Sequence, residues 1–100
     1  MPSPEPPDTI RLDKWLWHAR FFRSRGAASR AVAGHPFRID GRSTEKPHAL
    51  IAPGMVLTFA LGKQVRIVRV LAPGTRRGPA SEARTLYEDV DAAASQSQAP

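Results

Sequence analysis

The spacing of the apolar residues changes at Gly34, and this change most limits the folds that the chain can adopt. Before Gly34, apolar residues recur every three or four positions, which is typical of helices with one buried face. After it, Phe37 and Ile39 alternate with Arg38 and Asp40, which is typical of a strand. Helices followed by strands, rather than alternating with them, favour an α+β fold with a small, mainly antiparallel sheet.

The N-terminal pattern predicts a first helix over residues 11–22, capped by Asp8 or Thr9. Ser24 is a good cap for a second helix that runs through residue 33, and a following glycine would end it. One face of the first helix should be buried, and the other carries Arg11, Lys14, Trp17, His18 and Phe21. We expect the two aromatic rings of that face to pack within the domain, because large aromatics of small domains are usually core. The alternative is that they stack on RNA bases.

The rest of the chain predicts short strands and one more helix. Asp40-Gly41 and Pro53-Gly54 favour tight turns, and residues 55–61 and 64–71 are rich in strand-forming side chains. Pro79 can open a short C-terminal helix whose apolar stripe extends to Val90. The segments 1–9 and 91–100 are polar and rich in proline, serine or alanine, so we expect two disordered tails around one domain at residues 10–90.

Length and composition exclude several classes of protein. A chain of 100 residues holds one small domain, and the absence of cysteine excludes a disulfide framework, a thiolate metal site and a cysteine nucleophile. No apolar run reaches the roughly 20 residues that span a bilayer, and residues 1–9 do not resemble a signal peptide. The spacing of His18, His35 and His48 matches no metal motif. We therefore expect a cytoplasmic, monomeric protein that is not an enzyme and that has no catalytic residue, metal or cofactor.

The basic residues are concentrated in the predicted domain. The stretch from Arg11 to Arg84 holds all 15 basic residues but only four of the nine acids, a net charge of +11. Arginine dominates its first part, and the planar guanidinium suits phosphate and base edges. This excess indicates a polyanionic partner, and nucleic acid is the first candidate.

The predicted contact set lies on the two helices and the strand that follows them. The N-terminus of the second helix is a natural phosphate site, where backbone N–H groups, the Ser24 hydroxyl and two flanking arginines converge. Asp13 is interpreted as the residue that orients Arg11 or Lys14, or that caps the first helix. The predicted RNA-binding residues are Arg11, Lys14, Arg23, Ser24, Arg25, Arg30, Arg38 and Arg42, with Lys46, Arg76 and Arg77 as a second tier.

Several short motifs, taken in order, resemble the S-four-type RNA-binding domain, which is named after a protein of the small ribosomal subunit. They are RLDKWL at residues 11–16, Ser24-Arg25 with Ala28, Gly34 followed by RIDGR at residues 38–42, and PGMVL at residues 53–57. The shared unit is two helices and a β-hairpin region, the αL motif. RRGPASEA at residues 76–83 and LYE at residues 86–88 make the chain most similar to the small bacterial ribosome-associated heat-shock members of that family.

The resemblance implies binding of structured RNA, either ribosomal RNA or transfer RNA on the ribosome. The heat-shock members are implied to bind free large ribosomal subunits that still carry a nascent chain, and to help recycle them. Two other hypotheses remain open from the residues alone. One is a DNA-binding protein that uses the paired basic helices. The other is an accessory subunit that acts through protein contacts and is basic only for solubility.

Overall fold

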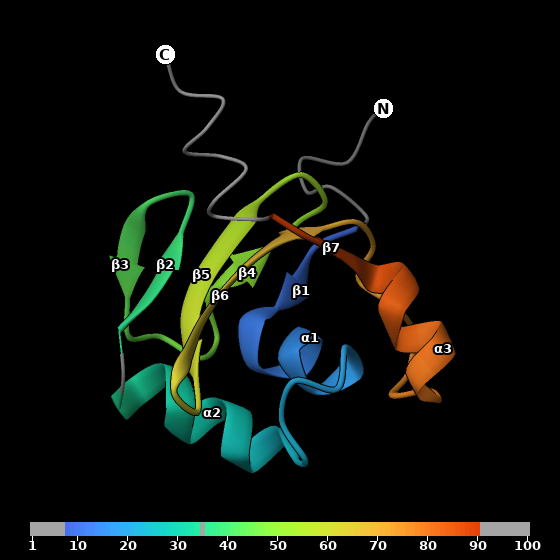
Figure 1. Ribbon diagram of the computed structural model, residues 1–100, viewed down its shortest axis with the longest axis horizontal. Coiled ribbons are helices and arrows are strands. Elements are labelled where there is room, and N and C mark those ends of the chain that lie inside the picture. Colours follow the sequence, from blue (N-terminus) through green and yellow to red (C-terminus); the bar gives the residue numbers. More distant parts are fainter. Residues whose placement is uncertain (1–7, 35, 91–100) are drawn as a thin grey trace, which may run out of the picture.

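The computed structural model describes residues 8–34 and 36–90, and most of the two predicted tails lies outside these ranges. Their elements, in chain order, are β1 (Ile10–Arg11), α1 (Leu12–His18), α2 (Arg25–Gly34), β2 (Phe37–Ile39), β3 (Arg42–Thr44), β4 (Leu50–Ile51), β5 (Val56–Leu61), β6 (Gln64–Val70), α3 (Ala80–Ala83), the 3-10 helix η1 (Arg84–Leu86) and β7 (Tyr87–Asp89). The predicted α+β class, with two N-terminal helices, a mainly antiparallel sheet and a short C-terminal helix, is confirmed (Figure 1).

Five strands form an antiparallel sheet in the order β3-β2-β5-β6-β7, and β1 pairs with β4 in a separate two-stranded ladder. The predicted turns join them. Asp40 and Gly41, with φ of 51° and 85°, make the two-residue turn between β2 and β3. Gly54, with φ of 98°, occupies the position of a type II turn that needs a positive φ.

The core lies between α1, α2 and one face of the sheet. Trp15, Leu16 and Val32 from the helices are fully buried together with strand residues such as Phe37 and Phe59. These two phenylalanines are cross-strand partners, and their rings stack at 4.9 Å between centroids. The helices are thereby fixed on the sheet.

The first helix is shorter than predicted. It ends at His18 instead of residue 22, because Arg20 adopts a left-handed conformation with φ of 66°. The N–H of Arg20 bonds to the Trp17 carbonyl and that of Phe21 to the Leu16 carbonyl, the two bonds of a Schellman motif. Glycine usually occupies the left-handed position, so an arginine there gave no stop signal in the sequence.

The predicted cap of this helix was also wrong. Arg11 is the N-cap residue and makes no side-chain capping bond. Instead, the first N–H groups of the helix bond to a distant loop: Leu12 donates to the Ala49 carbonyl at 2.8 Å, and Asp13 donates to the Pro47 carbonyl at 3.0 Å. The second helix agrees better with its prediction, since the Ala27 N–H donates to Ser24 Oγ at 3.0 Å and the helix ends one residue later than expected.

The C-terminal segment differs from the expected helix after residue 86. Tyr87–Asp89 forms strand β7 against β6, and ion pairs of 2.6 Å join Arg66 to Asp89 and Arg69 to Glu88. The pairing of acids with arginines on the neighbouring strand overrides a weak local helical pattern.

His18 was predicted on the face opposite the core, but only 2% of it is exposed. Its Nδ1 lies 3.2 Å from the carbonyl of Pro73, because the loop after β6 covers this side of α1. Phe21 packs among Trp15, Phe59 and Tyr87, as expected, with ring centroids 4.7–6.0 Å apart. Trp17 is only half-buried, beside the His18 ring.

Candidate nucleic-acid interface

A buried carboxylate organises the cations at the start of α1. The side chain of Asp13 is only 4% exposed, and it accepts hydrogen bonds from Arg11 Nε at 3.2 Å and from Arg11 Nη2 at 3.0 Å. Arg25 Nε, from the first residue of α2, lies 3.7 Å from the same carboxylate. We call these three residues the Asp13 cluster. Sequence reasoning assigned Asp13 an orienting role toward Arg11, but it did not foresee the contact with Arg25.

The geometry of the Asp13 cluster leaves both guanidinium groups available to a ligand. The side chains of Arg11 and Arg25 are 47% and 42% exposed, while the carboxylate between them is covered. Two cations share one anion, so the cluster keeps a net positive charge. A guanidinium group that is already held by a carboxylate on one side loses little further side-chain entropy when its other side binds a phosphate.

Two lysines extend this surface. Lys14 is exposed in the first turn of α1, and Lys46 is exposed next to Pro47, whose carbonyl accepts the Asp13 N–H. Because the 47–49 loop is hydrogen-bonded to the first turn of α1, the adjacent Lys46 lies near the same end of the helix as Arg11. Four predicted contacts from distant parts of the sequence are brought to one place.

The start of α2 carries a second part of the predicted set. Arg23 is exposed, and the half-buried Ser24 is held by its capping bond. A Cβ atom at Gly26 would lie 3.4 Å from Arg30 Nη1 and 3.9 Å from Ser24 Oγ, so the Arg30 guanidinium folds back over the first turn of its helix. Ser24, Arg25 and Arg30 therefore lie together at the N-terminal end of α2, where helix N–H groups favour an anion.

Arg38 and Arg42 lie on the sheet rather than on the helices. Both are exposed, in β2 and β3, on either side of the Asp40-Gly41 turn. The nearby acid is occupied: Asp40 Oδ1 accepts the Val56 N–H at 2.8 Å and fixes the hairpin to β5. The register pairs Arg42 with Ile39 and Arg38 with Ser43, so the two cations lie on opposite faces of the hairpin.

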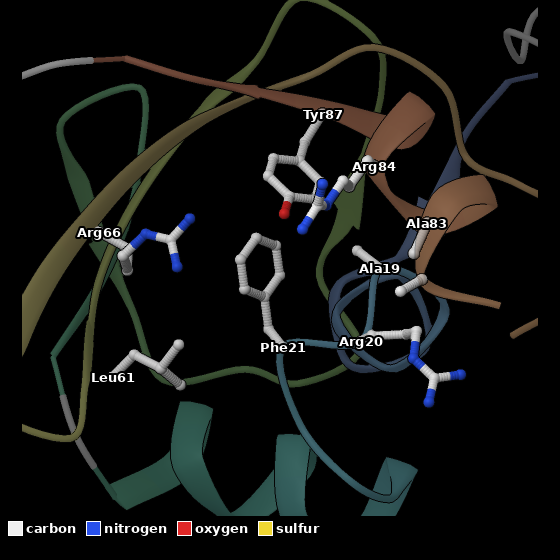
Figure 2. A pocket seen from close by; sticks show the side chains of 9 residues that line it. Ala19, Arg20, Phe21, Leu61, Arg66, Ala83, Arg84 and Tyr87 are labelled. Carbon is white, nitrogen blue, oxygen red and sulfur yellow. The ribbon is translucent and has the colours of Figure 1, made fainter. Parts of the chain in front are cut away.

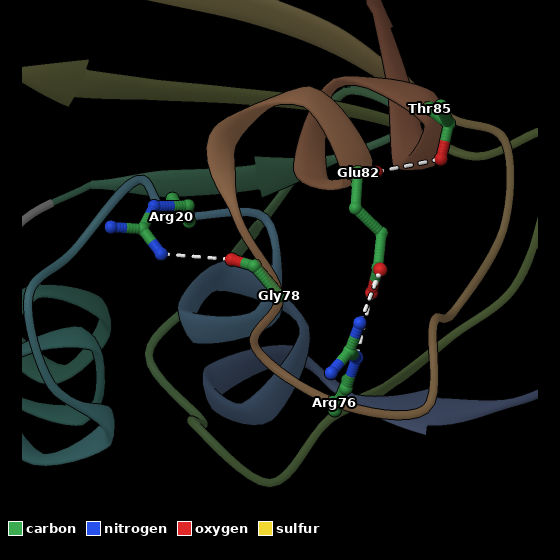
Figure 3. Close-up of polar contacts among 5 residues, drawn as sticks. All are labelled: Arg20, Arg76, Gly78, Glu82 and Thr85. Carbon is green, nitrogen blue, oxygen red and sulfur yellow. Dashed lines mark hydrogen bonds and ion pairs between the residues drawn. The ribbon is translucent and has the colours of Figure 1, made fainter.

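The structure places Arg76 and Arg77 elsewhere, near the C-terminal helix. Arg76 forms two hydrogen bonds to Glu82, at 3.1 and 2.7 Å (Figure 3). These bonds raise the pKa of Arg76 and lower the pKa of Glu82. Arg77 is half-buried, and its Nε has no partner among the described residues. Because Arg76 is already neutralised by Glu82, its charge is less available to a phosphate than those of the Asp13 cluster.

Sequence reasoning missed three further arginines. Arg20, Arg66 and Arg84 line one shallow pocket, although they come from the turn after α1, from β6 and from η1. The alternation in β6 does place Arg66 on the same side as the buried Val68 and Val70. The sequence alone does not indicate that Arg20 and Arg84 lie near Arg66, because Arg84 is brought there by the pairing of β6 with β7.

With this geometry in place, the chain can be compared with known proteins. It is 39% identical over 85 residues to heat shock protein 15 of Escherichia coli K12, a match that covers 85% of this chain and 63% of that protein. It is 37% identical over 93 residues to a heat shock protein 15 homologue of Aeromonas salmonicida, covering 92% of this chain and 70% of the homologue. The chain belongs to the heat shock protein 15 family. The predicted resemblance to the heat-shock members of the S-four-type family is thereby confirmed.

A solved structure of the same family has this fold. Heat shock protein 15 of Vibrio cholerae superposes with a TM-score of 0.80 at 29% identity, covering 89% of each chain. That protein is described as trimeric, which does not agree with the monomer expected from the sequence. No protein-family model matches the chain. The chain spans less than two thirds of the length of the Escherichia coli relative. Among the described residues, no helix is long and apolar enough to cross a membrane.

Proposed function

We propose that the chain binds structured RNA with a surface formed by the Asp13 cluster, Lys14 and Lys46, the start of α2 and the β2–β3 hairpin. The observation that carries this proposal is the buried Asp13 carboxylate, which lies against two half-exposed arginines, one at the N-cap of α1 and one at the start of α2. A basic surface that served only solubility would need no such buried organiser. Removing a carboxylate from water has a cost, which is offset when the charge is paired.

The mechanism is capture of the RNA backbone. Arginine and lysine neutralise phosphates and release counterions, and this supplies most of the affinity. A-form RNA is recognised mainly by its shape, its phosphate positions and its 2′-hydroxyl groups. The Ser24 hydroxyl accepts the Ala27 N–H and still has its own hydrogen to donate to an RNA oxygen. The assignment needs no catalytic residue, metal or cofactor.

The biological partner we infer is the large ribosomal subunit. We infer that the chain binds ribosomal RNA, or transfer RNA on the ribosome, in the cytoplasm, and that it helps to recycle subunits that carry nascent chains. Membership of the heat shock protein 15 family supports this role, as does the resemblance to ribosome-associated members of the S-four-type family.

Arg25→Glu is expected to weaken binding to a structured ribosomal RNA fragment by about tenfold or more, since a charge-assisted hydrogen bond contributes about 1.5–3 kcal/mol and the new carboxylate repels phosphate. Filter binding or fluorescence anisotropy measures the affinity, and circular dichroism checks the fold. Lys63→Glu is the matched control: it makes the same change of charge at an exposed turn residue that is not among the proposed contacts. Equal affinities for the two folded variants would remove the Asp13 cluster from the interface.

Sedimentation of a cell extract through a sucrose gradient tests the partner. We expect the chain to migrate with free large subunits, and the Arg25→Glu variant to shift toward the top of the gradient. A chain absent from every ribosomal fraction, at a salt concentration where it binds the RNA fragment, would contradict the ribosomal role.

A further inference from the structure

A second cationic site lies at the other end of α1. The pocket has a volume of about 270 Å³ and is bounded by the turn after α1, the end of β5, strand β6 and the C-terminal elements α3, η1 and β7 (Figure 2). Its lining consists of small and apolar side chains, two aromatic rings and three arginines. None of the residues predicted from the sequence to bind RNA lines it.

The charged side chains that the described residues contribute to the pocket are all arginines. Within residues 8–34 and 36–90, its ionisable lining residues are Arg20, Arg66, Arg84 and the Tyr87 hydroxyl. Arg20 donates from Nη1 to the Gly78 carbonyl at 2.8 Å, a neutral acceptor that leaves its charge unmatched. Arg84 is exposed and has no carboxylate partner among the described residues. Arg66 is paired with Asp89 at 2.6 Å, and the Arg20 guanidinium points away from the two aromatic rings (Figure 2), so Arg84 is the cation that remains for an anionic ligand.

The apolar part of the pocket suits a flat ring. The Arg66 guanidinium lies 5.2 Å from the centroid of the Phe21 ring, and the Phe21 and Tyr87 rings are 4.7 Å apart. Nucleic-acid bases stack on aromatic rings and on guanidinium planes of this kind. Pockets for drug-sized ligands hold roughly 300–1,000 Å³. A volume just below this range is enough for one base.

We propose that this pocket binds a single unpaired nucleotide of RNA, with the base against Arg66 and Tyr87 and the phosphate on Arg84. The proposal rests on the RNA binding proposed above, and it adds a preference for RNA that contains an unpaired nucleotide. The two sites are close enough for one RNA. The Asp13 cluster is at the first turn of α1, the pocket follows its last residue, and a seven-residue helix is about 10 Å long.

Two measurements on the full chain test the pocket. In the first, uridine and adenosine 5′-monophosphates are titrated and the ring protons of Phe21 and Tyr87 are followed by NMR. We expect these resonances to shift with the nucleotides and not with the same concentration of inorganic phosphate. Equal shifts with phosphate alone would reduce the pocket to a simple anion site and overturn the proposal.

The second measurement compares two RNA hairpins that differ by one bulged nucleotide. The wild-type chain should prefer the bulged hairpin by at least about fivefold, the smallest effect expected for one stacked base. Arg84→Ala should lose this preference, while Lys63→Ala keeps it. Arg25→Glu should weaken both hairpins by a common factor and leave the ratio unchanged.

The outcomes separate the two proposals. Tight binding of both hairpins without a preference would refute the pocket and leave the Asp13 surface intact. Failure to bind either hairpin, together with nucleotide shifts at Phe21 and Tyr87, would refute the proposed RNA surface and retain the pocket. Loss of the preference in the Lys63→Ala variant would show that overall charge is responsible, and this too would overturn the pocket.

Discussion

The affinity of this chain for structured RNA is expected to fall by about 10³-fold when the salt concentration is raised from 50 to 200 mM. The reason is counterion release: each phosphate neutralised by a cation lowers the affinity with a slope of about −0.9 in a plot of log K against log salt. The proposed surface offers at least six cations for such contacts, from the Asp13 cluster, Lys14, Lys46, α2 and the β2–β3 hairpin. A titration by fluorescence anisotropy measures the slope directly.

The same titration separates the competing functions. The slope should become shallower by about one for each cation removed, so Arg11→Ala and Arg38→Ala should reduce it and Lys63→Ala should not. A flat response would contradict phosphate binding and support an accessory role through protein contacts. Equal affinity for duplex DNA of the same length, at the same salt, would contradict the preference for A-form RNA and favour the DNA-binding hypothesis.

Trp15→Ala is expected to lower the free energy of unfolding by about 3–5 kcal/mol, a large part of the roughly 5–15 kcal/mol that stabilises a typical domain. Trp15 is fully buried, and its Nε1 donates to the Ala72 carbonyl at 2.8 Å, across 57 residues of sequence. Its ring also lies 6.0 Å from Phe21 and 6.4 Å from Tyr87. The substitution would leave a cavity and an unpaired carbonyl among the packed rings.

Urea denaturation followed by circular dichroism measures this loss, and the chain itself provides the control. Trp17→Ala removes the same side chain two positions away, where it is only half-buried, and should have a clearly smaller effect. Equal losses for the two variants would mean that Trp15 does not hold α1 to the loop after β6.

Most of the fold could be predicted from local features of the sequence. The change of period at Gly34, the Ser24 cap and the Asp40-Gly41 turn each have a direct physical meaning, and the structure contains all three. Features set by distant partners were missed. Arg20 ends α1 in a conformation usual for glycine, and Tyr87 enters a strand because β6 lies beside it.

The candidate site shows the same division. The sequence indicated a basic surface on the two helices and suggested that Asp13 orients a neighbour. It could not indicate that Arg25 joins that carboxylate, because this contact depends on how α2 lies against α1. The pocket around Arg66 and Arg84 could not be predicted from the sequence either, because it forms only when β7 pairs with β6. Asp40, an acid that lies between two cations in the sequence, accepts a backbone hydrogen bond from Val56 and so fixes the hairpin to β5.

The bonds from Leu12 and Asp13 to the 47–49 loop also constrain when the RNA surface can exist. A seven-residue helix is too short to persist in water on its own, so α1 forms only with the segments that pair with its first turn and cover Trp15. Those partners lie 34–57 residues further along the chain, and contacts of such separation form late, because their loops must close first. During synthesis, an incomplete chain that has emerged only as far as α2 contains five of the eight cations of the proposed surface, but that surface is not yet assembled. Under the proposed function, the ability to bind RNA arises only once these distant segments have folded onto α1.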